Sequence, residues 1–254
     1  MSWFPLYEAA LNGDLEKVTV LLANGADPNK ASTNGSTPLY VASQEGYLSI
    51  VETLLGKGAD PNKASTNGST PLIIASQDGN LPLVETLLEK GADPNKARTT
   101  TGSTPLYVAS LNAHHPVVEA LLKKGAAVDQ ARTNGSTPLY IASQVGNLPV
   151  VQALLKKGAD PNKANLDGVT PIQAATTPGL ADFMREYDRR NKTMLGIAAL
   201  DNVTRDTDAT LPVDLYEFMG KKDPNGNYVA GRRRKTRKSR KSKKSKKSKK
   251  RRRL

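Results

Sequence analysis

A stretch of 33 residues, 34–66, recurs along most of the chain. The next 33 residues, 67–99, repeat it with 25 identities. Its T-P-L triplet returns with prolines spaced by 33, 33, 34, 33 and 33 residues: Pro5, Pro38, Pro71, Pro105, Pro138 and Pro171. A fixed period of this length is typical of a solenoid, in which each unit contacts only its neighbours. We therefore expect six units, of which the first and the last are atypical.

Each unit is predicted to hold two short helices. In the 34–66 copy, Thr37 and Pro38 suit the start of a first helix and Gly46 its end. A second helix, from about Ser49 to Gly58, carries apolar residues at helical spacing. The segment that follows is rich in turn residues and too short and polar for a buried strand. The unit is thus helix, turn, helix and a projecting hairpin-like loop.

The pattern G-x-T-P-L-x-x-A-x-x-x-G-x-x-x-[IV]-V-x-x-L-L-x-x-G-A-D-x-N resembles the ankyrin repeat from about Pro5 to Tyr187. The resemblance implies an all-α repeat solenoid with projecting β-hairpin loops, a concave protein-binding face and no catalysis. Two departures stand out in the fourth unit, where 127–129 replaces the D-P-N turn and His114-His115 replaces Gly-Asn. The family usually has His after T-P-L, and this chain has other residues there: Tyr40, Ile73, Tyr107, Tyr140 and Gln173.

Three regions are predicted. Residues 1–190 form the ankyrin repeat domain, with repeats near 2–33, 34–66, 67–100, 101–133, 134–166 and 167–190. In the last repeat we expect a second helix at 178–189 with a polar outer face, because no neighbour covers it. Residues 191–231 are a short helical extension, with helices expected at 194–200 and 211–219. Residues 232–254 form a disordered basic tail.

The tail dominates the charge of the chain. The net charge is +13, from 37 basic and 24 acidic residues, and residues 232–253 hold 17 of the basic ones and no acid. The rest of the chain carries 37 − 17 = 20 basic residues against 24 acidic ones, or −4. We expect the tail to target the nucleus or to bind nucleic acid or another polyanion by its backbone phosphates, since no aromatic residue is present for base stacking. The residues concerned include Arg232, Arg233, Arg234, Lys235, Arg237, Lys238, Arg240, Lys241, Arg251, Arg252 and Arg253.

The sequence offers no pattern for catalysis, a cofactor or a metal. Cysteine is absent, which excludes disulfides and thiolate metal sites. The two histidines, His114 and His115, are adjacent and do not converge on a metal. The turn at 223–227 matches only the first ligands of a calcium loop. The recurring aspartates lie in a row at a turn position, which does not form a paired acid–base site. We therefore expect no enzyme activity and no cofactor.

Protein-binding residues are expected at the loop tips and on polar positions of the first helices. The recurring tyrosines have two interpretations: aromatic anchors for a partner, or packing residues between repeats. The candidates are Lys30, Asn34, Tyr40, Ser43, Gln44, Lys63, Asn67, Ser76, Gln77, Lys96, Arg98, Tyr107, Asn112, Arg132, Tyr140 and Gln144.

Our first hypothesis is a monomeric, non-enzymatic protein–protein interaction module of the cytoplasm or the nucleus and nucleolus, with the basic tail as targeting or polyanion-binding segment. A second makes the tail primary, in a nucleic-acid- or chromatin-associated protein. A third rests on 211–219, which resembles the F-box-like segment that closes some viral ankyrin proteins and would hold a ubiquitin ligase adaptor. The tail composition also resembles that of proteins from large DNA viruses of protists and algae, which would place the protein in a host cell. No stretch is long and apolar enough to span a membrane.

Overall fold

The fold is known from a computed structural model that describes residues 4–201, with side chains up to residue 193. The predictions made for the basic tail, for the turn at 223–227 and for the helix at 211–219 lie outside the described residues. A compact unit spans Met1–Ala198. Within the described part, no helix is both long and apolar enough to cross a membrane.

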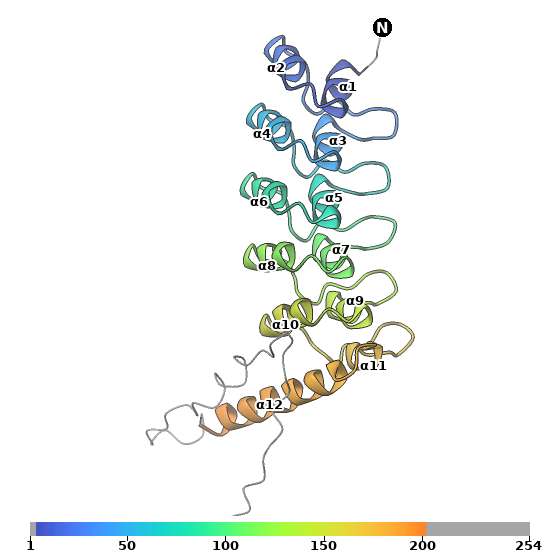
Figure 1. Cartoon of the computed structure of the whole chain (residues 1–254), viewed down its shortest axis with the longest axis vertical. Helices are drawn as coiled ribbons and strands as arrows, with labels where there is room; N and C mark the ends of the chain where they lie inside the picture. Colours follow the sequence, from blue (N-terminus) through green and yellow to red (C-terminus); the bar gives the residue numbers. More distant parts are fainter. Residues whose placement is uncertain (1–3, 202–254) are drawn as a thin grey trace, which may run out of the picture. The chain divides into compact units, whose positions relative to one another are not determined.

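The repeats form two columns of helices (Figure 1). Each first helix contacts the first helices of the neighbouring repeats, and in repeats one to five it also contacts the second helix of its own repeat. The first helices are α1 (Pro5–Leu11), α3 (Pro38–Gln44), α5 (Pro71–Asp78), α7 (Pro105–Leu111), α9 (Pro138–Val145) and α11 (Pro171–Ala174). The second helices are α2 (Leu15–Ala23), α4 (Leu48–Gly56), α6 (Leu81–Glu89), α8 (His115–Lys123), α10 (Leu148–Lys156) and α12 (Leu180–Asp201). The predicted all-α repeat solenoid is confirmed.

The T-P pair starts the first helices of repeats two to six as predicted. The Thr37 hydroxyl accepts a hydrogen bond from the Tyr40 backbone N–H at 3.1 Å, and Pro38 occupies the first turn, where its missing N–H costs nothing. The same threonine cap recurs in each copy: Thr70, Thr104, Thr137 and Thr170. The start of the helix is therefore encoded locally in every one of these repeats.

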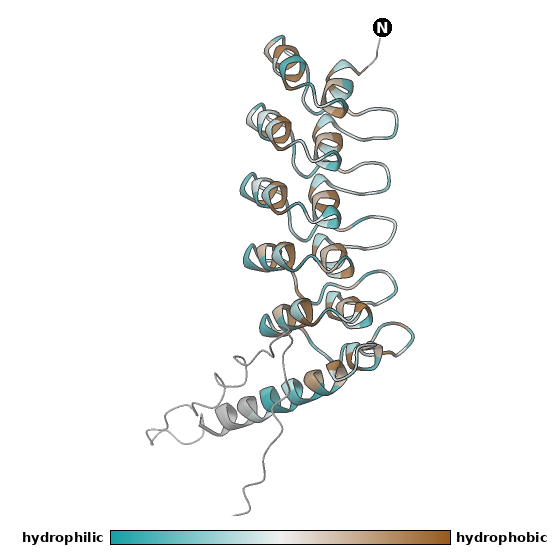
Figure 2. Ribbon diagram, in the orientation of Figure 1, coloured by the Kyte–Doolittle hydropathy of each residue, from teal (hydrophilic) through white to brown (hydrophobic). Residues whose placement is uncertain are grey.

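The core is a continuous row rather than a central cluster. Leu39, Leu72, Leu106 and Leu139 repeat one position of the first helix and are almost fully buried. Leu54, Leu87, Leu121 and Leu154 do the same for the second helix. The helices of both columns carry apolar and polar stretches (Figure 2). Each repeat thus covers the apolar face of the next, which is how a solenoid grows.

The loops project from the side of the first helices (Figure 1), but none forms a β-strand within residues 4–201. Each is closed by a backbone bond such as Ser32 N–H to the Ser36 carbonyl, at 2.9 Å. Three of the four pairs of neighbouring loops share a backbone bond such as Thr66 N–H to the Asn34 carbonyl, at 3.3 Å, and in the fourth pair the Thr100 hydroxyl donates to the Asn67 carbonyl at 3.4 Å. So few bonds fix the hairpin shape without making the ladder that defines a strand pair.

Asparagine side chains join the turns of neighbouring repeats. The Asn29 amide accepts from the Asp60 N–H at 2.8 Å and donates to the Gly58 carbonyl at 3.0 Å. Asn62 and Asn95 make the same pair of bonds one repeat further on. These bonds supply lateral connections between repeats in a chain that lacks the family's usual histidine after T-P-L.

The fourth repeat breaks this connection. Asp129 replaces the asparagine and accepts from the Asp160 N–H, but a carboxylate cannot donate to a carbonyl. Burial is the main influence on this side chain and raises the pKa of Asp129 above its ordinary value of 3.8, against the opposing effects of the Asp160 N–H and the Lys163 charge.

The fourth repeat also changes the turn between its helices. The structure corrects the sequence alignment there: Ala113, not His114, occupies the position of Gly46, Gly79 and Gly146. Ala113 has φ 59°, a left-handed conformation that the glycines adopt without cost. His114 takes the helix-capping position but makes no capping bond, and its Nε2 instead lies 3.0 Å from the Gln77 carbonyl.

The predicted helices at 178–189 and 194–200 form one helix, α12. Its first turns are apolar and its middle is polar (Figure 2). Leu180 and Met184 are buried against the core, and the Tyr187 hydroxyl donates to the Leu155 carbonyl at 2.8 Å. Ion pairs such as Arg190–Glu186, at 2.7 Å, and Lys192–Asp188, at 2.8 Å, support the polar part. α12 therefore closes the stack with an apolar start and a polar continuation.

Candidate functional site

The structure sorts the predicted binding residues by exposure. The exposed ones are Lys30, Asn34, Gln44, Lys63, Asn67, Gln77, Lys96, Asn112 and Gln144. Arg98, Arg132 and Tyr140 are partly buried. Tyr40, Ser43, Ser76 and Tyr107 are buried. The predicted basic residues of the tail lie outside the described part of the chain.

The buried serines cannot contact a partner directly, and the interpretation of Ser43 and Ser76 as contact residues is corrected. The Ser43 hydroxyl donates to the Leu39 carbonyl in its own helix at 2.8 Å. Ser110 and Ser143 do the same in α7 and α9. These three hydroxyls are satisfied inside their own helices and belong to the packing, whereas the buried Ser76 hydroxyl has no hydrogen-bond partner among the described residues.

Tyr40 and Tyr107 occupy the packing position, the second of the two interpretations of the tyrosines. Tyr107 is only 3% exposed and lies in a small apolar cluster with Ile73, Val108 and Ile141. This cluster joins the first helices of three consecutive repeats beside the loops. Tyr107 therefore supports the surface above it and is not a free aromatic anchor.

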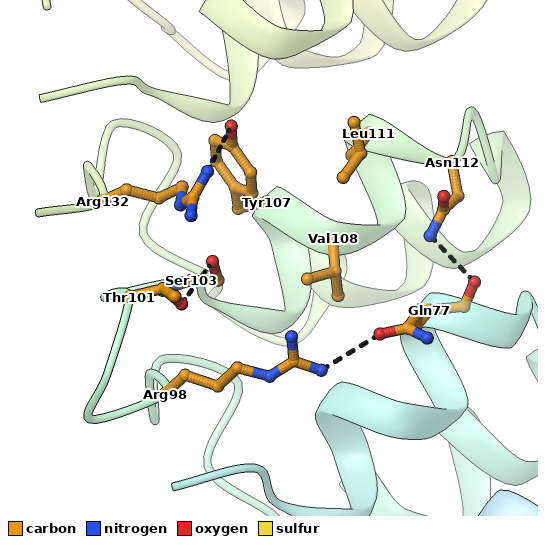
Figure 3. A pocket seen from close by; sticks show the side chains of 9 residues that line it. All are labelled: Gln77, Arg98, Thr101, Ser103, Tyr107, Val108, Leu111, Asn112 and Arg132. Carbon is orange, nitrogen blue, oxygen red and sulfur yellow. Dashed lines mark hydrogen bonds between the residues drawn. The ribbon is translucent and has the colours of Figure 1, made fainter. Parts of the chain in front are cut away.

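A groove of about 230 Å³ lies on this surface, over the first helices and loops of repeats three and four (Figure 3). Arg98 and Arg132 enter it from two consecutive loops on one side, and Leu111 and Asn112 lie at the end of α7 on the other. Tyr107 and Val108 lie between the two sides. The remaining lining residues are Gln77, Thr101 and Ser103.

Arg98 is held in place by two side chains. Its Nε donates to the Ser69 hydroxyl at 2.7 Å, and its Nη2 donates to the Gln77 side-chain oxygen at 3.0 Å. Asn112 Nδ2 in turn donates to the Gln77 backbone carbonyl at 3.0 Å. The guanidinium thus has a fixed position and keeps three of its five N–H donors for another acceptor.

Arg132 is held by the tyrosine below it. Its guanidinium lies 5.0 Å from the centre of the Tyr107 ring, a cation–π distance, and its Nη1 lies 3.4 Å from the Tyr107 hydroxyl. Its Nε is buried and has no acceptor among the described residues. The protein therefore positions this side chain without satisfying all of its donors.

Neither arginine has a carboxylate partner within 4.0 Å in the part of the chain that the structure describes. The ion pairs found in that part lie in α8 and α12, away from the groove. The groove lining, drawn from residues 77–132, contains no acidic residue. The groove therefore carries two positive charges that the residues around it do not compensate.

Leu111 is the lining residue that the sequence interpretation missed. It is 41% exposed and stands where repeats two, three and five have Gln44, Gln77 and Gln144, whereas the atypical first repeat has an exposed leucine, Leu11, at this register. The signal was present as an apolar departure from glutamine at one register. Thr101 and Ser103 were also missed, because they differ little from the polar tips of the other loops, and so was the buried Val108.

A second groove, of about 290 Å³, occupies the equivalent position over repeats one to three. Ser65 stands there at the register of Arg132, and Gln44 at the register of Leu111. The Ser65 hydroxyl is satisfied within its own loop by Asn67 and Ser69. No charged side chain of the described residues lines this groove.

Comparison with known proteins agrees with this architecture. The family model described as "Ankyrin repeats (3 copies)" matches residues 6–98 and 95–165, well over half of the chain. A search of curated proteins found no match. Ankyrin repeats are generic protein-interaction modules and typically non-enzymatic scaffolds. On the match and on the stacked helix pairs, the chain belongs to the ankyrin repeat family.

Proposed function

We propose that this chain is a non-enzymatic module that holds a partner protein against the first helices and loops of its ankyrin stack. The observation that carries the proposal is the groove of repeats three and four. It combines two positioned guanidinium groups that lack carboxylate partners among the described residues with an exposed leucine. Positioned charges around an apolar side chain are typical of specific protein interfaces.

Proximity labelling in the native cell tests this function. Three forms are compared: the full chain, the full chain with R98S, R132S and L111Q, and a chain truncated after Gly231. The triple variant installs the residues of the other repeats, so the fold is expected to be kept. We expect the groove variant to lose a defined set of labelled proteins that the truncated chain retains. The same set in all three forms would contradict groove binding.

For the basic tail we propose polyanion binding or nuclear targeting. The support is its composition, 17 Lys and Arg in residues 232–253. Truncation after Gly231 is expected to abolish retention on heparin or duplex DNA and to reduce nuclear accumulation of a fluorescent fusion. Each phosphate that the tail no longer neutralises lowers the salt dependence of binding by about 0.9 in the log–log slope. A truncated chain that still binds DNA and enters the nucleus equally well would exclude both roles.

The F-box-like interpretation of 211–219 is the remaining alternative. Substituting Leu215 and Phe218 by serine tests it. We expect loss of ubiquitin ligase components from the labelled set only if this segment holds an adaptor.

A further inference from the structure

We propose that the groove of repeats three and four binds an extended, acidic peptide segment, with Arg98 and Arg132 each contacting a carboxylate and Leu111 contacting an apolar side chain between them. This inference rests on the proposed protein-binding function and names the chemistry of the segment that the groove takes.

The charges of the two groove arginines are not balanced by acidic groups in the lining. Arg98 uses two of its five N–H donors and Arg132 uses one, and all of these bonds go to neutral groups. With no acid in the lining, the groove presents two guanidinium groups to solvent and to a ligand. Carboxylates match the planar fork of a guanidinium, and such pairs are among the strongest hydrogen bonds in proteins.

The spacing of the two arginines fits an extended peptide. The two arginines lie in consecutive loops, hence about one repeat apart. Helices packed side by side lie about 8–10 Å apart. An extended peptide advances about 3.3 Å per residue, so it covers that distance in about three residues. Two acidic residues separated by about two others can therefore contact both arginines.

The groove also has apolar side chains beside the two arginines. Leu111 is exposed opposite the arginines, and Val108 and Tyr107 lie between them (Figure 3). An apolar side chain placed between two acids would cover Leu111 and remove its surface from water. Nucleic acid is a poorer match, because stacking needs an exposed aromatic ring and Tyr107 is buried.

Both arginines are held in place before a ligand binds. Ser69 and Gln77 hold Arg98, and the Tyr107 ring holds Arg132. A long side chain that is already fixed loses less entropy when it binds than a free one does. Lys96, in the same loop as Arg98, is exposed by contrast. The groove thus holds its two guanidinium groups in position for an anion, whereas the surface around it only carries charge.

The location of the groove in the array also distinguishes it. In the fourth repeat several residues differ from those repeated in the other copies: Leu111, Ala113 and Asp129. Ala113 has a left-handed backbone and Asp129 lacks a bond that its asparagine counterparts make. Departures of this kind from local rules are expected near functional sites. They coincide here with the two groove arginines.

The test uses the full chain at physiological salt and an unlabelled peptide in which Glu-Leu-Ala-Glu is flanked by Gly and Ser. Binding is measured by calorimetry, and its location by hydrogen–deuterium exchange. We expect slower exchange in residues 98–112, and no change in the equivalent residues 32–45. The matched peptides replace both Glu by Gln, Leu by Ser, or one Glu by phosphoserine. They report on the carboxylates, the apolar contact and a phosphate source in turn.

The decisive variant is R98S/R132S, which installs the serine found at this register in Ser32 and Ser65. It is expected to weaken peptide binding about tenfold. The control is K90S/K124S, which removes the same charge from two exposed lysines that do not line the groove, and it should bind as tightly as the unaltered chain. The basic tail is identical in both variants, so its attraction for acids cancels.

Equal binding by R98S/R132S and the unaltered chain would overturn the proposal, as would exchange protection that misses residues 98–112. A phosphoserine peptide that binds where the Glu peptide does not would overturn the choice of a carboxylate. The proposed function fails separately. If proximity labelling still depends on the groove while the acidic peptide does not bind, protein binding stands and only the acidic chemistry is wrong.

Discussion

The two grooves of this stack are built from the same backbone positions and carry different side chains. Over repeats one to three, Ser65 and Gln44 line a neutral groove in which the serine is satisfied within its own loop. Over repeats three and four, Arg132 and Leu111 take these positions. The helices, threonine caps and buried leucines beneath are equivalent. A near-identical scaffold thus acquires a distinct surface from a few substitutions.

Substitutions in the core test whether the scaffolds beneath the two grooves are equivalent. Leu39 lies beneath the neutral groove and Leu106 beneath the charged one, and both are almost fully buried. Each substitution, L39A or L106A, is expected to lower the free energy of unfolding by about 2–5 kcal/mol, because it removes buried methyl groups and leaves a cavity. Chemical denaturation measures both. A large difference between the two would show that the scaffolds are not equivalent.

A graft tests whether the side chains alone make the charged groove. S32R and S65R place arginines over repeats one to three at the registers of Arg98 and Arg132, and Q44L completes the apolar contact. We expect the triple variant to bind the acidic peptide at two sites with affinities within about tenfold of each other, a difference of about 1.4 kcal/mol. Calorimetry gives the stoichiometry.

The graft has its own control. S32K, S65K and Q44L add the same charge without the planar fork of a guanidinium. Binding at the second site should be weaker with lysine. A stoichiometry that stays at one with arginine would mean that the Gln77 support of Arg98, whose register holds Leu11 in the neutral groove, or the extra residue in the 99–101 loop, is also required.

The asparagine bridges offer a third test. D129N in the fourth repeat is expected to restore the donation to the Gly158 carbonyl and to raise the free energy of unfolding at pH 7 by about 1 kcal/mol. The matched reverse change, N62D, should lower it by a similar amount, because Asn62 makes both bonds.

This third test depends on pH with a defined sign. The folded-state pKa of Asp129 is raised by burial, so the folded chain binds its proton more readily than the unfolded chain does. The charged form therefore destabilises the fold above the raised pKa. As pH falls from that value towards 3.8, the unaltered chain gains stability and the advantage of D129N shrinks. An advantage that is constant from pH 7 to pH 4 would contradict this account.

Much of the fold was predictable from local chemistry. Thr37 and Pro38 supply the N-cap and the first position of α3, and Gly46 follows its end with a positive φ, so the helix pairs could be predicted from the sequence. The continuity of α12 was not predictable in this way, because the polar stretch at 189–193 resembles a break between two helices. Ion pairs such as Lys192–Asp188, one turn apart, stabilise the helix there. The predicted β-hairpins lack strands because neighbouring loops share too few backbone bonds.

The groove was predictable only in part. Arg98 and Arg132 are visible in the sequence as departures from serine at the loop tips. The burial of Tyr107 and the exposure of Leu111 depend on how three repeats pack together, and no single repeat specifies them. Arg132 is positioned by a tyrosine 25 residues earlier. Contacts between repeats therefore decide which of the polar and charged tip residues are fixed.

The smallest expected effect comes from the turn between the helices, where the two grooves differ in backbone strain. Ala113 has φ 59° and Gly46, at the same register, has φ 78°. A113G is expected to raise the free energy of unfolding by about 0.5 kcal/mol, because relief of left-handed strain exceeds the extra entropy that glycine loses on folding. G46A should cost a similar amount, since its new Cβ would meet no atom closer than Asn80 Nδ2 at 3.4 Å and strain alone would act. Paired denaturation curves measure both changes. If A113G stabilises the chain and also weakens peptide binding, the strained turn helps to hold Leu111 in the groove; if binding is unchanged, the strain is local to the turn and the charged groove owes its difference to side chains alone.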